Sequence, residues 1–222
     1  MHLGALKAKN MYEVVSELPP GRKAIQCKWV LWTKHDKKGQ ISHFKGQLVT
    51  KDFTQVFRED FTFTFAPVAH WDSIHFVLCI TTLKDYELRH IDVKNAYFNT
   101  PLQEDICMVA PESSEAWFWC LNKGLYGLRQ PGQQWYLHLH EAYSSLGFHL
   151  YQSDWNIYVR KSMFPMSISA TSINDLLLAS TSKAESDLAT RQIQQKYAIT
   201  DGTTLNGSSD FAYADEKTKS YS

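Results

Sequence analysis

The sequence predicts an α+β fold. Three observations indicate this class. Residues 24–53 have the pattern of a β-hairpin, residues 132–146 have the spacing of an amphipathic helix, and short apolar strands follow at 157–159 and 176–179. Because strands and helices alternate irregularly along the chain, this class is favoured over a doubly wound parallel sheet.

The hairpin has the composition of two strands around a turn. Residues 26–33 are rich in Trp and Val, residues 36–39 read DKKG, and residues 41–50 return as the second strand. A helix is predicted from about residue 72, because apolar residues there recur at the 3–4 spacing of a buried stripe. Its inward positions are Ile74, Val77 and Leu78. Residues 88–93 then have the apolar run of a core strand.

The second half of the chain predicts helices around short strands. The amphipathic pattern at 132–146 ends at Gly147, a residue suited to the backbone conformation that follows a helix. Its predicted inward residues are Trp135, Leu139, Ala142, Tyr143 and Leu146. Another helix is predicted at 183–197. We expect residues 206–222 to form a disordered tail, because Ser, Asp, Lys and Thr dominate there and no buried face can be drawn.

Composition limits the class of protein. The chain has 222 residues, enough to bury a core in one domain or two closely packed subdomains. With 44% hydrophobic and 21% charged residues it resembles an ordinary soluble protein. Its formal net charge is zero, so any nucleic-acid contact needs a local basic groove.

Two further features concern the location of the chain. No apolar stretch is long enough to span a bilayer, and the N-terminus lacks a signal pattern. We therefore expect an intracellular chain, cytoplasmic or nuclear, that is not secreted and has no membrane partner.

The four cysteines are widely spaced and form no CxxC pair, so we expect reduced thiols and neither a zinc site nor a disulfide framework. They are Cys27, Cys79, Cys107 and Cys120.

Acidic residues occur in two segments where a strand meets a turn. Asp92 lies between Ile91 and Val93, so its carboxylate points away from its apolar neighbours. An acid within an apolar strand needs a cation or hydrogen-bond donors, which leaves a metal site and a turn-capping role as alternatives. The second segment contains Asn174 and Asp175. Two carboxylates brought together in this way are able to hold a pair of Mg²⁺ ions for displacement at a phosphate.

Several blocks occur in the order found in one family. They read LPPGRKAIQCKWV at 18–30, FKGQLVTKDFTQ at 44–55, FAPVA at 65–69, IDVKNAYF at 91–98, LYGLRQ at 125–130 and SINDLLLA at 172–179. Together they resemble the reverse transcriptases of Ty1/copia-type retrotransposons, whose two metal-binding motifs read L-D-V-x-x-A-F and Y-V-D-D-L-L-I-A. The resemblance covers nearly the whole chain.

The resemblance implies a fold and a reaction. It implies the fingers and palm of a right-hand polymerase, with a ferredoxin-like palm sheet and no thumb, in a truncated copy. Residues 1–10 would be an N-terminal extension and 11–205 the reverse transcriptase-like domain, with fingers at about 11–87 and 107–135 and palm in the remainder. The implied function is RNA-directed DNA synthesis from an RNA template, a DNA primer and deoxynucleotides, with Mg²⁺ as cofactor.

The same resemblance implies roles for individual residues. Asp92 and Asp175 would bind metal, with Asn174 in place of a catalytic Asp. Tyr97 would lie under the sugar of the incoming nucleotide, although its spacing also suits a core aromatic. The other implied substrate-binding positions are Lys45, Gln47, Tyr126 and Gly127.

Departures from the family pattern predict impaired or absent activity. Ser172 replaces a Tyr, Asn174 replaces an Asp, and Gln47 replaces the Arg that would grip the triphosphate. Residues 131–133 replace A-P-R and remove another cation. Residues 167–172 are small and polar where the family has large aliphatics, which predicts a poorly packed strand. The alternative function is a non-enzymatic relic with at most weak nucleic-acid binding.

The predicted hairpin is basic and aromatic, which leaves two interpretations open. In the first interpretation, the lysines contact a template backbone while the aromatic side chains support bases. In the second, the hairpin is a solvated surface. The basic residues are Lys28, Lys34, Lys37, Lys38, Lys45 and Lys51, among Trp29, Trp32 and Phe44.

Overall fold

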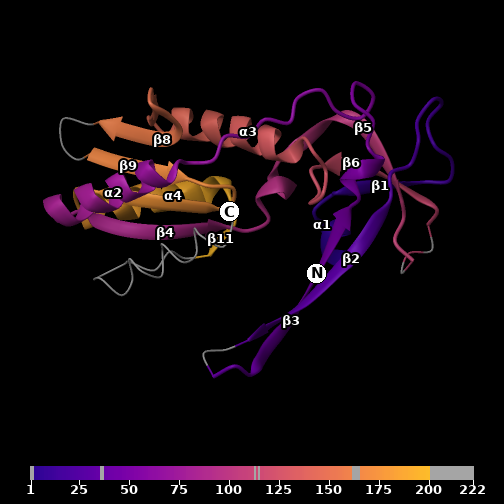
Figure 1. The fold of residues 1–222 in the computed structure, drawn as a ribbon, viewed down its shortest axis with the longest axis horizontal. Coiled ribbons are helices and arrows are strands. Elements are labelled where there is room, and N and C mark those ends of the chain that lie inside the picture. Colours follow the sequence, from indigo (N-terminus) through magenta and orange to yellow (C-terminus); the bar gives the residue numbers. More distant parts are fainter. Residues whose placement is uncertain (1–2, 36–37, 113, 115, 162–165, 201–222) are drawn as a thin grey trace. The chain divides into compact units, whose positions relative to one another are not determined.

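A computed structural model of the chain describes residues 3–35, 38–112, 114, 116–161 and 166–200. These residues form an α+β arrangement, as the pattern of the segments predicts (Figure 1). The sheets are antiparallel. The predicted tail and part of the predicted hairpin turn lie outside the described residues. The chain divides into two compact units: Met1–Ala66 with Tyr97–Trp135, and Pro67–Ala96 with Tyr136–Ser222.

The first unit contains a three-stranded sheet and a separate hairpin. The sheet has the order β1-β6-β5, with β1 at Tyr12–Val15, β5 at Pro101–Val109 and β6 at Phe118–Lys123. The hairpin joins β2 (Cys27–His35) to β3 (Ile41–Thr50), where the sequence predicts it. Short helical segments complete the unit and its junction: α1 (Leu3–Ala8), η1 (Asp52–Thr54) and η2 (Ala96–Asn99). Its core includes Leu6, Ile25, Leu48, Met108 and Trp119.

The expectation of reduced cysteines is wrong for one pair. Cys107 of β5 and Cys120 of β6 are direct partners in the antiparallel register, and a disulfide joins them. The two cysteines are 13 residues apart in the sequence, and only the strand register brings their side chains together. The sequence spacing alone therefore does not predict this disulfide. Cys27 and Cys79 are free thiols.

The second unit is built on a six-stranded sheet of order β11-β4-β10-β9-β8-β7. The strands are β4 (Glu87–Val93), β7 (His149–Tyr151), β8 (Asp154–Lys161), β9 (Met166–Thr171), β10 (Asp175–Ser180) and β11 (Ile199–Thr200). The helices are α2 (Trp71–Lys84), α3 (Pro131–Ser145), of which the residues from Tyr136 onward belong to this unit, and α4 (Lys183–Lys196). The predicted strand at 88–93 and the predicted helices agree with these bounds to within one or two residues.

Alternation along the strands gives this sheet two different faces. On one face, Ile74 and Val77 of α2 pack against Leu88, Leu177 and other apolar side chains of the strands. On the opposite face, an ion pair joins Arg89 of β4 to the carboxylate of Asp187 on α4. The candidate acidic residues Asp92 and Asp175 share the α2 face with Leu88 and Leu177, because each lies an even number of residues from them.

The polar strand β9 packs well, contrary to the sequence-based prediction. Ser167, Ser169 and Thr171 are all at least 98% buried, and each hydroxyl has a partner. The Ser169 hydroxyl lies 2.8 Å from the hydroxyl of Tyr143, and Ser167 donates to the carboxylate of Glu185 at 3.1 Å. Small polar residues therefore replace aliphatic packing with a buried hydrogen-bond network.

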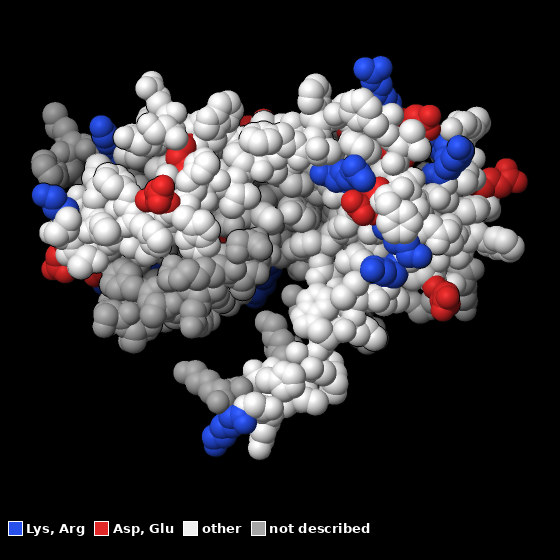
Figure 2. All heavy atoms as spheres, viewed as in Figure 1, with Lys and Arg blue, Asp and Glu red and all other residues white. Residues whose placement is uncertain are grey.

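The surface charge is mixed. Figure 2 shows Lys and Arg side chains interspersed with Asp and Glu on the visible face, with wide uncharged areas between them. This distribution agrees with a formal net charge of zero.

Candidate functional site

Asp92 is positioned by the strand β4. Its neighbours Ile91 and Val93 are fully buried, which anchors the strand, while Asp92 itself is half-buried on the opposite side. The hydroxyl of Thr200 in β11 donates to Asp92 Oδ2 at 3.4 Å.

The structure brings Asp175 and Asn174 to Asp92. Asp175 is the direct partner of Asp92 in the register between β10 and β4. The turn before β10 is fixed by two backbone bonds: Ser172 N–H donates to the Asp175 carbonyl at 2.8 Å, and Val93 N–H donates to the Asn174 carbonyl at 2.8 Å. The sequence motifs therefore meet at one edge of the second unit.

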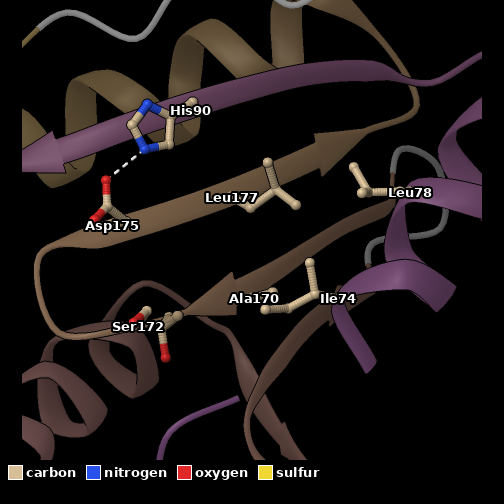
Figure 3. A pocket seen from close by; sticks show the side chains of 8 residues that line it. Ile74, Leu78, His90, Ala170, Ser172, Asp175 and Leu177 are labelled. Atoms are coloured by element: carbon tan, nitrogen blue, oxygen red, sulfur yellow. Dashed lines mark hydrogen bonds and ion pairs between the residues drawn. The ribbon is translucent and has the colours of Figure 1, made fainter. Parts of the chain in front are cut away.

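The two acidic side chains have different surroundings. Asp175 is 94% buried, and its Oδ1 lies 2.5 Å from His90 Nε2, as the dashed line in Figure 3 marks. His90 is two residues before Asp92 and shares its face of β4. The carboxylate of Asp175 is therefore already engaged by a side chain that forms an ion pair with it when protonated.

Asn174 contributes a neutral group at the turn. Its Oδ1 is buried without a hydrogen-bond partner. A carboxylate at this position would carry a full negative charge close to Asp92 and Asp175. The amide oxygen supplies a donor atom for a cation but no charge.

These residues do not fit a pair of magnesium ions. Mg²⁺ requires near-octahedral oxygen ligation and is usually held through one or two carboxylates plus phosphates. Here Asp92 is the accessible carboxylate, Asp175 is engaged by His90, and Asn174 is neutral. Within the described residues, no group of three or more His, Cys, Asp or Glu side chains is arranged to hold a metal ion.

The predicted substrate-binding residues lie in the first unit. Tyr97 packs against Tyr126, with 4.8 Å between ring centroids, and burial raises the pKa of Tyr97 to about 12, with a further contribution from Tyr126. Gln47 is a partner of Val30 in the β2–β3 register. Lys45 pairs with Trp32 in the same register, and its side chain lies outside the described part of the chain.

Gly127 has a structural reason to be glycine. Its φ is +90°, and a Cβ there would lie 2.2 Å from the carbonyl oxygen of Thr50. The backbone of Thr50 also donates to the Tyr126 carbonyl at 2.9 Å. This close approach joins the 125–130 motif to the end of β3, whatever role Gly127 has toward a substrate.

His90 is a residue of this site that no sequence motif identifies. Its position two residues before Asp92 places it on the same face of a strand, and this was a usable signal. Its pairing with Asp175 depends on the register between β4 and β10, which the sequence does not encode locally.

Comparison with known proteins decides the family. A sequence model of the family described as Reverse transcriptase (RNA-dependent DNA polymerase) matches residues 9–208. The chain belongs to this family. That family generally uses a divalent metal, and its α+β fold with antiparallel sheets agrees with the structure.

Similar proteins refine this assignment to the copia-type reverse transcriptase region of retrotransposon Pol polyproteins. The chain is 38% identical over 138 residues to the retrovirus-related Pol polyprotein from transposon TNT 1-94 of Nicotiana tabacum, a match that covers 60% of this chain and 10% of that protein. It is 24% identical over 209 residues to the Pol polyprotein from transposon RE1 of Arabidopsis thaliana, covering 92% of this chain and 14% of that protein. Along the described part of this reverse transcriptase, no helix has the length and apolar character needed to cross a membrane.

Proposed function

We propose that this chain is an RNA-directed DNA polymerase domain whose nucleotidyl transfer is impaired or lost. The observation that carries the proposal is the state of the dipeptide at 174–175. One of its two side chains is a neutral amide, and the other is a buried carboxylate 2.5 Å from His90. Asp92 is left as the accessible anion of the site.

The expected decrease in the rate of nucleotidyl transfer follows from the carboxylate that is absent at position 174. Metal-assisted phosphoryl transfer depends on anionic ligands that fix the cations beside the reacting oxygens. Loss of one such group from a preorganised site lowers the rate by roughly 10²- to 10⁴-fold. Because the residues present do not fit a pair of Mg²⁺ ions, we assign them no catalytic step.

The proposal extends to the ligands of the two units. We infer that the second unit corresponds to the palm and the first to the fingers, so that a template and primer and a deoxynucleotide are the ligands of the inherited reaction. Gln47 weakens the nucleotide site further, because a neutral amide does not replace a bidentate guanidinium toward a triphosphate.

Primer extension on an RNA template with Mg²⁺ or Mn²⁺ tests the proposal. The native chain is compared with a variant that carries Asn174→Asp and Gln47→Arg, which restores one anion and one cation. We expect extension by the native chain to be at least about 10-fold slower, because one anionic ligand is worth more than this. Equal rates for the two chains would contradict the proposal.

A non-enzymatic chain with weak nucleic-acid binding is the second candidate. It is favoured by the exposed aromatic and apolar side chains of the β2–β3 hairpin, which include Trp32 and Phe44, and by the exposed Lys28 elsewhere in the same hairpin. Bases stack on such aromatics, and lysines contact phosphates. A gel-shift series from low to high salt tests this binding, since affinity through phosphate contacts must fall as salt rises. A salt-independent shift, or no shift at low salt, would exclude it.

A further inference from the structure

We propose that His90 is a positioning residue that withholds Asp175 from cations, independently of the change at position 174. The inference rests on the proposed function, because it concerns the same site. It implies that Asn174→Asp restores the missing charge but leaves cation binding weaker than the site would otherwise allow. A second substitution, at His90, is needed to release the carboxylate.

The geometry of the two strands explains why this contact forms. His90 is the register partner of Leu177, and Asp92 is the register partner of Asp175. All four side chains lie on one face, so His90 is the diagonal neighbour of Asp175 across the β4–β10 ladder. The contact at 2.5 Å between Nε2 and Oδ1 is therefore set by the register of the sheet.

Burial strengthens the contact. The side chains of His90 and Asp175 are only 15% and 7% exposed, so little water competes for the carboxylate. Ile74 and Leu78 of α2 and Ala170 of β9 line a cavity of about 20 Å³ beside the pair (Figure 3). A cavity of this size holds about one water molecule, whereas Mg²⁺ usually keeps several waters.

These facts define a competition for one oxygen atom. A cation that binds Asp175 through Oδ1 must first break a charge-assisted, buried contact with the imidazole. Contacts of this kind reduce the affinity of a competing ligand by roughly 10- to 100-fold. In the native chain, Asn174 already weakens binding, so the effect of His90 becomes measurable only after the charge at 174 is restored.

Mn²⁺ binding measured by electron paramagnetic resonance tests the inference. Four full-length chains are compared: native, Asn174→Asp, His90→Gln, and the double variant. We expect the double variant to bind Mn²⁺ at least about 10-fold more tightly than Asn174→Asp alone. As a matched control, the exposed His149 of β7 is changed to Gln in the Asn174→Asp background, and this change is expected to have no effect.

Equal Mn²⁺ affinity of the double variant and of Asn174→Asp would overturn the role of His90 and leave the proposed function intact. Tight binding and rapid primer extension by the native chain would instead contradict the proposed function. His90→Asn is the second variant if His90→Gln does not fold.

Nuclear magnetic resonance of the Asn174→Asp chain tests the same competition without a substitution of His90. With ¹⁵N-labelled histidine, the ring resonances of His90 are expected to change as Mg²⁺ binds, because the imidazole must leave Asp175. Binding of Mg²⁺ that leaves these resonances unchanged would overturn the competition.

Discussion

At the scale of single residues, the proposed function depends on three side chains that lie where β4 ends and β10 begins. Asp92 has the exposure that a ligand needs, Asp175 is engaged by His90, and Asn174 contributes an oxygen without charge. The register between β4 and β10 places Asp92 opposite Asp175. The residues that depart from the family pattern therefore lie on a backbone that brings the two motif segments together.

The buried tyrosine–serine pair gives a prediction about stability. We expect Tyr143→Phe to lower the free energy of unfolding by about 1–3 kcal/mol, because Ser169 loses its partner at 2.8 Å in a fully buried site. Urea unfolding followed by circular dichroism measures this. Adding Ser169→Ala should recover part of the loss, since both polar groups are then removed. Tyr151→Phe, at an exposed position, serves as the control and should have no effect.

Tyr97 predicts a specific dependence on alkaline pH. Burial raises the pKa of Tyr97 from 10.0 to about 12 in the folded chain, so folding favours the neutral phenol. This stabilisation is complete below pH 10 and is lost as the pH rises from 10 towards 12. We expect the free energy of unfolding of the native chain to fall more steeply across this range than that of Tyr97→Phe. Parallel curves from urea unfolding at pH 9 to 12 would show that Tyr97 is not the group responsible.

At the scale of elements, much of the second unit follows from local patterns. The helix predicted at 132–146 forms at Pro131–Ser145, and its predicted inward residues Trp135, Leu139 and Tyr143 are buried. Helix spacing and turn residues are local properties, so the sequence predicts them well. The meeting of the two motifs was expected from the family resemblance, and the β4–β10 register brings Asp92 opposite Asp175.

The sequence patterns did not predict the features that depend on contacts between residues far apart in the chain. The sequence of β9 predicts poor packing, because the hydroxyl partners of Ser167 and Ser169 come from α4 and α3. The Cys107–Cys120 disulfide and the His90–Asp175 contact depend on strand register in the same way. No local pattern identifies such partners.

The close approach between the 125–130 motif and β3 gives a prediction at this scale. We expect Gly127→Ala to lower the free energy of unfolding by at least about 2 kcal/mol, because its Cβ would lie 2.2 Å from the Thr50 carbonyl oxygen at a φ of +90°. Gly21→Ala is the matched control, with a φ of +78° and no atom within 4 Å. It should lose only about 1 kcal/mol. Equal losses in urea unfolding would rule out the contact with Thr50 as the cause.

At the scale of the whole molecule, the family and the state of the site point in different directions. The family match covers residues 9–208, and the α+β fold keeps antiparallel sheets in both units. The formal net charge is zero, so attraction to nucleic acid depends on local surfaces such as the β2–β3 hairpin. The family assignment therefore rests on the whole chain, whereas the proposed loss of activity rests on the side chains of one site.

Single-turnover primer extension of the native chain against Asp92→Asn tests the central claim most directly. Asp92 is the accessible carboxylate of the site, so any remaining metal-dependent transfer must depend on it. We predict that both chains extend the primer at the same background rate, because the native site already lacks the anions that the reaction needs. A native rate more than about 10-fold above that of Asp92→Asn, with both chains equally folded, would contradict the account.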